Sequence, residues 1–423
     1  MPYIKSIYAR EVLDSRGYPT ICTEVYTQCG ACGSAIVPSG ASSGIYEAME
    51  LRDMQEKRYF GQGVLKAVSH VNKLLREKLC GMCIFDQAGI DRAMLTLDGT
   101  DNKANVGANG ILSVSMACAQ AAAACLSMPL YRYLGGCFSY TLPLPLINMI
   151  SGGIHCNSGL SFQEFMIIPS GASSFKEGVR IGAEIFYHLG QILRSQGMSL
   201  AVGTEGGYAP ALSSNEKALA LVVKAIAQAG YQPGKDVVLA IDAAAPQLWV
   251  NGKYHLCDKE NMDMTTKDLT DYYEYLCDKF PIRFIEDGLD QDDWEGWCEL
   301  TRRLGSKVII AGDDFFVSNV SRMHMGAQKG AGNGVLIKPN QAGTLTEAVA
   351  GARYAQRMGY EVIFSHRLGD SEDTFLADLT VASGAGYIKT GAVCRAERTA
   401  KYNRLMKIED ELGEAGAYGL WKY

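Results

Sequence analysis

Charged side chains follow short apolar runs at a regular spacing between Val237 and Gly391. Each run has the length of a buried strand, and the charged residues lie 23 to 44 residues apart, the first interval being the longest. A strand, a crossover helix and two loops need about 25 to 30 residues. In a (β/α) barrel the carboxyl ends of the strands face one pocket, so these side chains should converge. They are Asp242, Glu286, Asp313, Lys338, His366 and Lys389.

Three of these residues are carboxylates, which repel one another unless a cation lies among them. Oxygen ligands and water suit Mg²⁺ or Mn²⁺ rather than zinc. We therefore predict that Asp242, Glu286 and Asp313 are metal ligands. A lysine beside such a cation has its ammonium form disfavoured, so the pKa of Lys338 or Lys389 should fall and allow one of them to act as a base.

These groups suit the removal of a proton next to a substrate carboxylate, because the enolate-like intermediate of that reaction needs strong charge neutralisation. Any one of the six residues alone is more simply an ordinary solvated charge at a strand end. Six of them in register favour a shared site.

Two more polar clusters occur earlier in the chain. One contains Gly152–His155 with Gln163 and Glu164 close behind, and the other is Gly203–Gly207. Each follows an apolar run. Glycine beside a charged residue either lets the backbone approach a ligand closely or makes a plain turn, and both readings stay open. Of the charged residues in these clusters, Glu205 is the one that we expect to act as an acid.

The chain has 423 residues, enough for a barrel of about 250 to 300 residues and a smaller domain. Residues 3–37 have the alternating pattern of an antiparallel hairpin, and the Gly/Ser segment 38–46 has the composition of a mobile lid. Residues 47–80 and 86–135 are predicted to be helical.

A glycine pair at Gly135 and Gly136, followed by Pro143 and Pro145, interrupts the helical pattern. We place the domain boundary at this break. The prediction is an α/β chain with an α+β capping domain at residues 1–138 and a barrel at 139–423.

Composition excludes several classes of protein. Hydrophobic residues make up 48% of the chain, charged residues 20%, and the net charge is −6 with both signs interspersed, so nothing suggests a nucleic-acid partner. The N-terminus shows no apolar signal-peptide core and no apolar segment approaches about 18 residues, so we expect no membrane span and a cytoplasmic location.

Thirteen cysteines are scattered through predicted helices and strands, which favours reduced core thiols over disulfides. Two Cys-x-x-Cys pairs, Cys29 with Cys32 and Cys80 with Cys83, leave a zinc site as the alternative. The first pair falls in a glycine-containing hairpin turn.

Several motifs resemble those of enolase, and the similarity runs nearly from end to end. The segments that carry it are Leu13–Gly17, Pro38–Tyr46, Leu97–Thr100, Gln163–Met166, Gly206–Pro210, Glu286–Leu289, Lys338–Leu345, Ser365–Arg367 and Ile388–Gly391. The resemblance implies a modified (β/α)₈ barrel behind the capping domain and a homodimer or larger assembly. It also implies reversible dehydration of 2-phosphoglycerate to phosphoenolpyruvate, the enolase step of glycolysis and gluconeogenesis.

The resemblance also implies two Mg²⁺ ions per site. Asp242, Glu286 and Asp313 match the ligands of the first ion, in agreement with the argument from charge, and Ser42 in the lid matches a ligand of the second.

The catalytic roles follow the same match. Lys338 falls on the general base that removes the C2 proton, and Glu205 falls on the acid that assists departure of the C3 hydroxyl. Lys389 matches the contact to the substrate carboxylate, and Arg367 matches the phosphate-binding arginine, whose fork suits two oxygens. The remaining matched pocket residues are His155, Gln163, Glu164 and His366.

The sequence departs from the enolase pattern at a few positions. Thr204 stands where the family has Asp before the acid, and Leu368 stands at a substrate-binding position where it has Ser. Ala211 and Tyr18 each replace an Asn. Losing the hydroxyl at Leu368 removes a donor to the phosphate, which is worth about 1 to 3 kcal/mol.

These departures motivate an alternative function, a divergent lyase acting on a related phospho- or phosphono-carboxylic acid. A non-catalytic binding protein is a third hypothesis, against which the intact set of catalytic residues argues.

Overall fold

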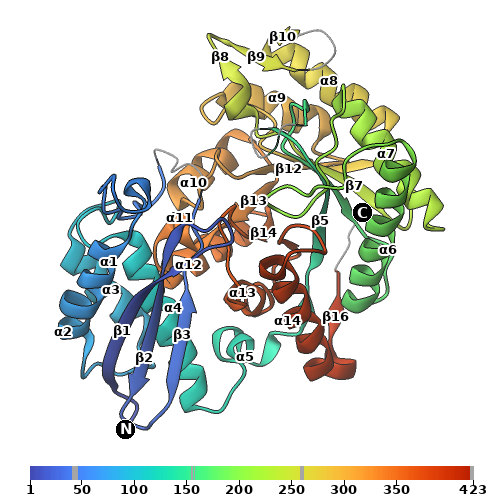
Figure 1. Cartoon of the computed structure of the whole chain (residues 1–423). Coiled ribbons are helices and arrows are strands. Elements are labelled where there is room, and N and C mark those ends of the chain that lie inside the picture. Colours follow the sequence, from blue (N-terminus) through green and yellow to red (C-terminus); the bar gives the residue numbers. More distant parts are fainter. Residues whose placement is uncertain (41–45, 154–155, 157, 258–261, 420–423) are drawn as a thin grey trace.

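A computed structural model describes residues 1–40, 46–153, 156, 158–257 and 262–419 (Figure 1). The chain begins with an antiparallel sheet of β1 (Ile4–Leu13), β2 (Pro19–Thr27) and β3 (Cys32–Ile36), as the alternating pattern predicts. Of the helices of this domain, the first, second and fourth contact the sheet, while the third and fifth contact the fourth. The helices are α1 (Leu65–His70), α2 (Arg76–Leu79), α3 (Gln87–Asp98), α4 (Ala108–Cys125) and α5 (Leu130–Gly135), with a π-helical turn at Val71–Leu75 between α1 and α2.

The helical prediction for residues 47–80 is wrong in its first half. Helix α1 begins only at Leu65, and three residues between positions 54 and 60 have positive φ. The Asp53 carboxylate accepts hydrogen bonds from the backbone N–H groups of Leu65 and Lys66 at 2.9 and 2.8 Å. A carboxylate that caps a helix from twelve residues upstream leaves no mark in the periodicity of the sequence.

The second domain is a closed barrel with the strand order β11-β12-β13-β14-β15-β5-β6-β7. Neighbouring strands are parallel except β6, which is antiparallel to both β5 and β7. The predicted fold class, a modified (β/α)₈ barrel preceded by an α+β domain, is confirmed. The strands are β5 (Leu144–Ser151), β6 (Glu164–Ile168), β7 (Val238–Asp242), β11 (Ile282–Glu286), β12 (Ile309–Gly312), β13 (Gly334–Ile337), β14 (Glu361–Ser365) and β15 (Tyr387–Lys389).

Helices surround the barrel strands (Figure 1). They are α6 (Phe175–Ser195), α7 (Asn215–Gln228), α8 (Thr266–Lys279), α9 (Trp294–Leu304), α10 (Val320–Lys329), α11 (Pro339–Ala342), α12 (Leu345–Arg357), α13 (Phe375–Ser383) and α14 (Ala396–Leu412). Between β7 and α8 the chain forms a small sheet of β8 (Trp249–Val250), β9 (Lys253–Leu256) and β10 (Met262–Met264). This insertion accounts for the long interval between Asp242 and Glu286 in the sequence. Strand β16 (Ala417–Tyr418) pairs with β4 (Thr141–Leu142).

The barrel has an inner and an outer apolar core. Alternate strand residues such as Val238 and Ala240 fill the interior, while Leu239 and Ile241 belong to the larger core outside. This is the period of two that a strand imposes on its side chains. The interior is therefore packed, and only the rim is open to a ligand.

The first domain is joined to the barrel rim by hydrogen bonds at the start of the lid segment and just before it. The backbones of Ser39 and Gly369 exchange two hydrogen bonds of 2.8 and 3.0 Å. The Asp373 carboxylate accepts a hydrogen bond from Ile36 N at 2.8 Å. The structure thus fixes the first domain over the loops that carry the site. The domain limits 1–138 and 139–423 stay a prediction.

Helix α4 is the one helix of the described chain that is long and apolar enough, by length and composition, to cross a membrane. Polar residues interrupt it at Asn109, Ser113, Ser115 and Gln120, so it is not an uninterrupted apolar segment of about 18 residues. Of its span, 83% is buried inside the protein. A buried domain helix passes the same test, so this is weak support for a membrane span.

All thirteen cysteines are free thiols. Only Cys22 and Cys118 are buried, so the prediction of core thiols is wrong for most of them. Within the described part of the chain, neither Cys-x-x-Cys pair contributes to a cluster of three possible metal ligands, so the zinc alternative gains no support.

Candidate active site

The rim charges are positioned by the alternation of each strand. A residue two places after an inward-facing apolar residue also points inward. Ala240 leads in this way to Asp242, and Phe284 leads to Glu286. The same step leads from Ala311 to Asp313, from Leu336 to Lys338 and from Tyr387 to Lys389.

Glu164 reaches the same rim from the opposite direction. It is the first residue of β6, and β6 runs antiparallel to its neighbours, so Glu164 is in register with Ser151 and Asp242 at the ends of β5 and β7. Gln163, one residue earlier, donates from Nε2 to Asp242 Oδ2 at 3.3 Å. A parallel strand here would carry Glu164 to the far end of the barrel.

Lys389 is the positive centre of this side of the rim. Its Nζ lies 2.8 Å from Asp242 Oδ2 and 2.7 Å from Glu286 Oε2. The same atom lies 3.3 Å from Glu164 Oε2. Burial raises the pKa of Glu286 well above its ordinary value, and Asp242 raises it further. One ammonium therefore does not fully neutralise the carboxylates that it contacts.

Lys338 forms a separate ion pair with Asp313. Burial alone would raise the pKa of Asp313, but Lys338 and Arg367 outweigh it and hold that pKa below its ordinary value. Burial would likewise lower the pKa of Lys338, yet Asp313 keeps it raised. The lowered lysine pKa that we predict beside a cation is therefore not produced by the protein groups around Lys338.

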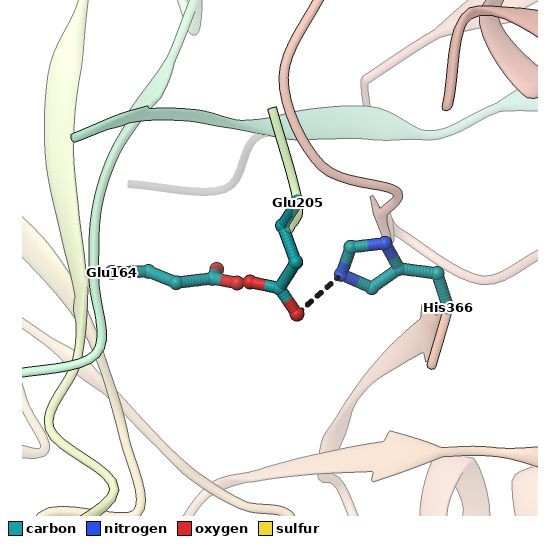
Figure 2. A group of neighbouring side chains, drawn as sticks. All are labelled: Glu164, Glu205 and His366. Carbon is teal, nitrogen blue, oxygen red and sulfur yellow. Dashed lines mark ion pairs between the residues drawn. The ribbon is translucent and has the colours of Figure 1, made fainter. Parts of the chain in front are cut away.

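Glu164, Glu205 and His366 form a compact buried group (Figure 2). One ligand atom from each lies within 4.8 Å of the others. Figure 2 shows the two carboxyl groups pointing toward each other, with the His366 ring on the other side of Glu205. His366 Nε2 is 3.6 Å from Glu205 Oε1, too long for a hydrogen bond.

Arg398 fixes the protonation of His366. Its Nη1 donates to His366 Nδ1 at 2.6 Å, and a guanidinium can only donate. Nδ1 is therefore the acceptor, and the neutral ring carries its proton on Nε2, facing Glu205. Burial lowers the pKa of His366 well below its ordinary value, and Arg398 lowers it further. His366 thus presents a neutral N–H to the pocket at pH 7.

Arg398 also anchors Thr204 and Leu368, two of the positions that we interpret as departures from the enolase pattern. Its guanidinium is fully buried and donates to the backbone oxygens of Thr204, at 3.3 Å, and Leu368, at 2.8 Å. The Leu368 side chain lines the pocket beside Arg367. Nothing in the spacing of the sequence singles out Arg398, because it comes from the start of α14, 30 residues from Leu368 and 194 residues from Thr204 along the chain.

Arg367 is held by a partner that the sequence analysis missed. Arg367 Nη1 lies 3.1 Å from Glu47 Oε2, and its Nη2 donates to Glu47 Oε1 at 3.3 Å. Both side chains are buried. Glu47 comes from the first domain, directly after the lid segment. This position next to the lid is the one feature of the sequence that could have indicated Glu47 as a site residue. The Glu47 carboxylate thus occupies the guanidinium donors of Arg367 that we predict to bind the substrate phosphate.

Glycines hold the Glu205 loop against the barrel. A Cβ on Gly207 would lie 2.7 Å from Asn148 Oδ1, and one on Gly203 would lie 2.8 Å from the Ser151 side chain. The Glu205 carbonyl accepts a hydrogen bond from Ala392 N at 2.9 Å. The cluster forms a turn, in which Gly206 N donates to Gly203 O at 3.1 Å, and its close contacts are with β5 rather than with a ligand.

The predicted site residues are brought together at one pocket, apart from three. Glu164 lies buried beneath it against Lys389, and Ser42 and His155 fall outside the described residues. The predicted residues that line the pocket are Gln163, Glu205, Asp242, Glu286, Asp313, Lys338, His366, Arg367, Leu368 and Lys389.

The pocket has an excess of acidic groups. Six carboxylates line it against the three cationic side chains of Lys338, Arg367 and Lys389. Asp287 and Asp314 join Asp313 in a second cluster whose ligand atoms lie within 4.8 Å of one another. Burial raises the pKa of Asp314 to about 6, and Asp313 adds to the effect.

This donor set fits a divalent cation, because buried oxygens that repel one another are what such an ion requires. The two compact clusters are not the predicted triad, however. Only Asp313 belongs to one of them, while Asp242 and Glu286 face Lys389.

Two family models match the chain. The model described as "Enolase, N-terminal domain" covers residues 4–134, and the one described as "Enolase, C-terminal TIM barrel domain" covers residues 139–422. The chain belongs to the enolase family. Members of the enolase family typically use Mg²⁺ and act on small phosphorylated carboxylates, so the acidic pocket of this enolase-family protein is that of a lyase or a related enzyme.

Replacing Lys389 with methionine tests the electrostatics of the rim. Lys389→Met leaves Asp242 and Glu286 without their ammonium, and breaking a buried ion pair costs about 3 to 5 kcal/mol. We expect a large fall in melting temperature in EDTA, and partial recovery on adding Mg²⁺, which supplies positive charge to the same carboxylates.

The matched control is Lys401→Met. Lys401 is also buried and pairs with Asp370 at 2.7 Å, but it does not line the pocket. This variant should lose stability without recovering it in Mg²⁺. Equal recovery in both variants, or in neither, would contradict the placement of the cation site at the rim.

Proposed function

We propose that this protein catalyses the reversible dehydration of 2-phosphoglycerate to phosphoenolpyruvate as a Mg²⁺-dependent glycolytic lyase. The observation that carries the proposal is the convergence of Lys338, Lys389, Glu205 and Arg367 on one acidic pocket in an enolase-family chain. We also propose a cytoplasmic location and, by the family resemblance, a homodimer or larger assembly.

The substrate carboxylate binds at Lys389, whose buried ammonium can pair with it. Mg²⁺, when held by Asp242, Glu286 and Asp313 with Ser42 serving a second ion, supplies further positive charge to that carboxylate. The substrate phosphate binds the guanidinium of Arg367, which offers two parallel donors. These contacts hold C2 of the substrate toward the lysine rim.

Lys338 Nζ takes the C2 proton, and Glu205 gives a proton to the C3 hydroxyl, which leaves as water. Asp313 raises the pKa of Lys338, and a cation held by Asp313 would weaken this effect and so favour proton transfer to Lys338. The N–H of neutral His366 faces Glu205 and can orient its carboxyl group. Lys338 would thus be coupled to a predicted metal ligand through its ion pair with Asp313.

A second candidate function rests on Leu368. Its aliphatic side chain lines the pocket next to Arg367, where a hydroxyl would donate to a phosphate oxygen. A lyase acting on a related phospho- or phosphono-carboxylic acid would need one donor fewer at this position.

Formation of phosphoenolpyruvate from 2-phosphoglycerate, followed by ultraviolet absorbance with and without Mg²⁺, tests the two functions. We expect turnover that requires Mg²⁺ and that falls on the order of 10²- to 10⁴-fold in Lys338→Ala, because the general base is lost. Lys329→Ala, at an exposed position away from the pocket, is the control and should keep full activity. A silent wild type that gains activity in Leu368→Ser would replace the proposed function with the second candidate.

Glu47 should compete with the substrate phosphate for Arg367. One guanidinium fork pairs with one anion at a time, so Glu47→Gln should lower KM for 2-phosphoglycerate and the inhibition constant of inorganic phosphate on the order of ten-fold. Steady-state kinetics measure both. Glu50→Gln is the matched control, because Glu50 pairs with Arg52 at 2.7 Å in the same segment. An unchanged or higher KM in Glu47→Gln would refute the competition.

A further inference from the structure

Cys29 and Cys125 bring their sulfur atoms together from distant parts of the first domain. The residues are 96 positions apart, and their Sγ atoms lie 3.0 Å from each other. Cys29 lies in the turn between β2 and β3, and Cys125 is the last residue of α4. Cys29 shares a Cys-x-x-Cys motif with Cys32, but the sulfur atom that it contacts is that of Cys125.

The packing of α4 on the sheet holds this arrangement in place (Figure 1). A Cβ on Gly33 would lie 2.1 Å from Ala121 N and 2.3 Å from Ala117 O, so β3 and α4 touch backbone to backbone. A hydrogen bond of 2.7 Å joins the hydroxyls of Thr23 and Ser113 along the same interface. The hairpin turn and the end of α4 are thus fixed to each other.

Thr27 links the two sulfur atoms. Its hydroxyl lies 3.1 Å from Cys29 Sγ, 3.6 Å from Cys125 Sγ and 3.0 Å from Ala31 O. Hydrogen bonds from Thr27 and Cys125 lower the pKa of Cys29 to about 7, whereas burial raises the pKa of Cys125. Cys29 is also the more exposed of the two, so it is the sulfur that meets a reagent first.

We propose that Cys29 and Cys125 are a redox-active dithiol that a low-molecular-weight disulfide converts to an intramolecular disulfide. The Cys29 thiolate attacks the small disulfide, forms a mixed disulfide and releases one thiolate. Cys125, losing its proton, then attacks the Cys29 sulfur and releases the second. The protein dithiol is oxidised by two electrons, and the small disulfide is reduced to two thiols.

The bond would tie the β2–β3 turn to the end of α4. It would close a loop of 96 residues in the unfolded chain, which favours the folded state of the first domain. The proposal does not depend on the proposed catalytic function, because neither cysteine lines the pocket.

The test treats the full-length protein with mixtures of reduced and oxidised glutathione, blocks remaining thiols with N-ethylmaleimide and measures intact and peptide masses. We expect the wild type to lose two thiols and to yield a peptide that joins Cys29 to Cys125, without retained glutathione. Cys125→Ser should stop at a mixed disulfide with glutathione on Cys29. Cys32→Ser, which removes the other cysteine of the motif, should behave like the wild type.

Two further measurements keep the test independent of any one variant. Alkylation of Cys29 in the wild type should rise through pH 7, and oxidation should raise the melting temperature of the wild type and of Cys32→Ser but not of Cys125→Ser. A wild type that accumulates glutathione on Cys29 as Cys125→Ser does, or that joins Cys29 to Cys32 instead, would overturn the proposal.

Discussion

The burial of like charges at the rim of the barrel is the constraint on which the rest of the structure depends. Asp242 and Glu286 share the ammonium of Lys389, while Asp313 pairs with Lys338. Removing an ionised carboxylate from water is energetically unfavourable. The attraction of a single opposite charge a few ångströms away offsets about 4 kcal/mol of this cost at the effective dielectric constant of a protein. The raised pKa of Glu286 shows that the balance is incomplete, which makes the rim receptive to a further cation. The proposed affinity for a metal would thus be a consequence of how the barrel ends its strands.

The surrounding architecture maintains this unfavourable arrangement. An apolar interior positions each rim residue by alternation, and the reversed strand β6 adds Glu164 to the same end. The first domain contributes Glu47, which gives the buried Arg367 an anion in place of a substrate. Arg398 fixes both the tautomer of His366 and the backbone of the loops on either side. Under the proposed function, binding of substrate would exchange one set of buried ion pairs for another, and the contact between the domains would be part of that exchange.

Much of this could be predicted from sequence, because a buried parallel strand leaves a short apolar run and its last residue must face the pocket. The positions of Asp242, Lys338 and Lys389 at one rim follow from that rule alone. Glu47 and Arg398 could not be found in this way, since each acts through a tertiary contact with no fixed spacing. The predicted helix before Leu65 failed for a similar reason, because a distant carboxylate decides where that helix begins. Hydrophobic periodicity indicates which face of a helix or strand is buried, but it does not indicate which residues that face contacts.

Exchange of the C2 hydrogen of 2-phosphoglycerate with solvent deuterium, followed by NMR in the presence and absence of Mg²⁺, tests the central claim most directly. It reports on proton removal whether or not the hydroxyl then leaves. The account predicts exchange that requires Mg²⁺ and is lost in Lys338→Ala. Exchange that persists in Lys338→Ala, or that proceeds equally in EDTA, would contradict the assignment of the rim as a metal-dependent site of proton abstraction.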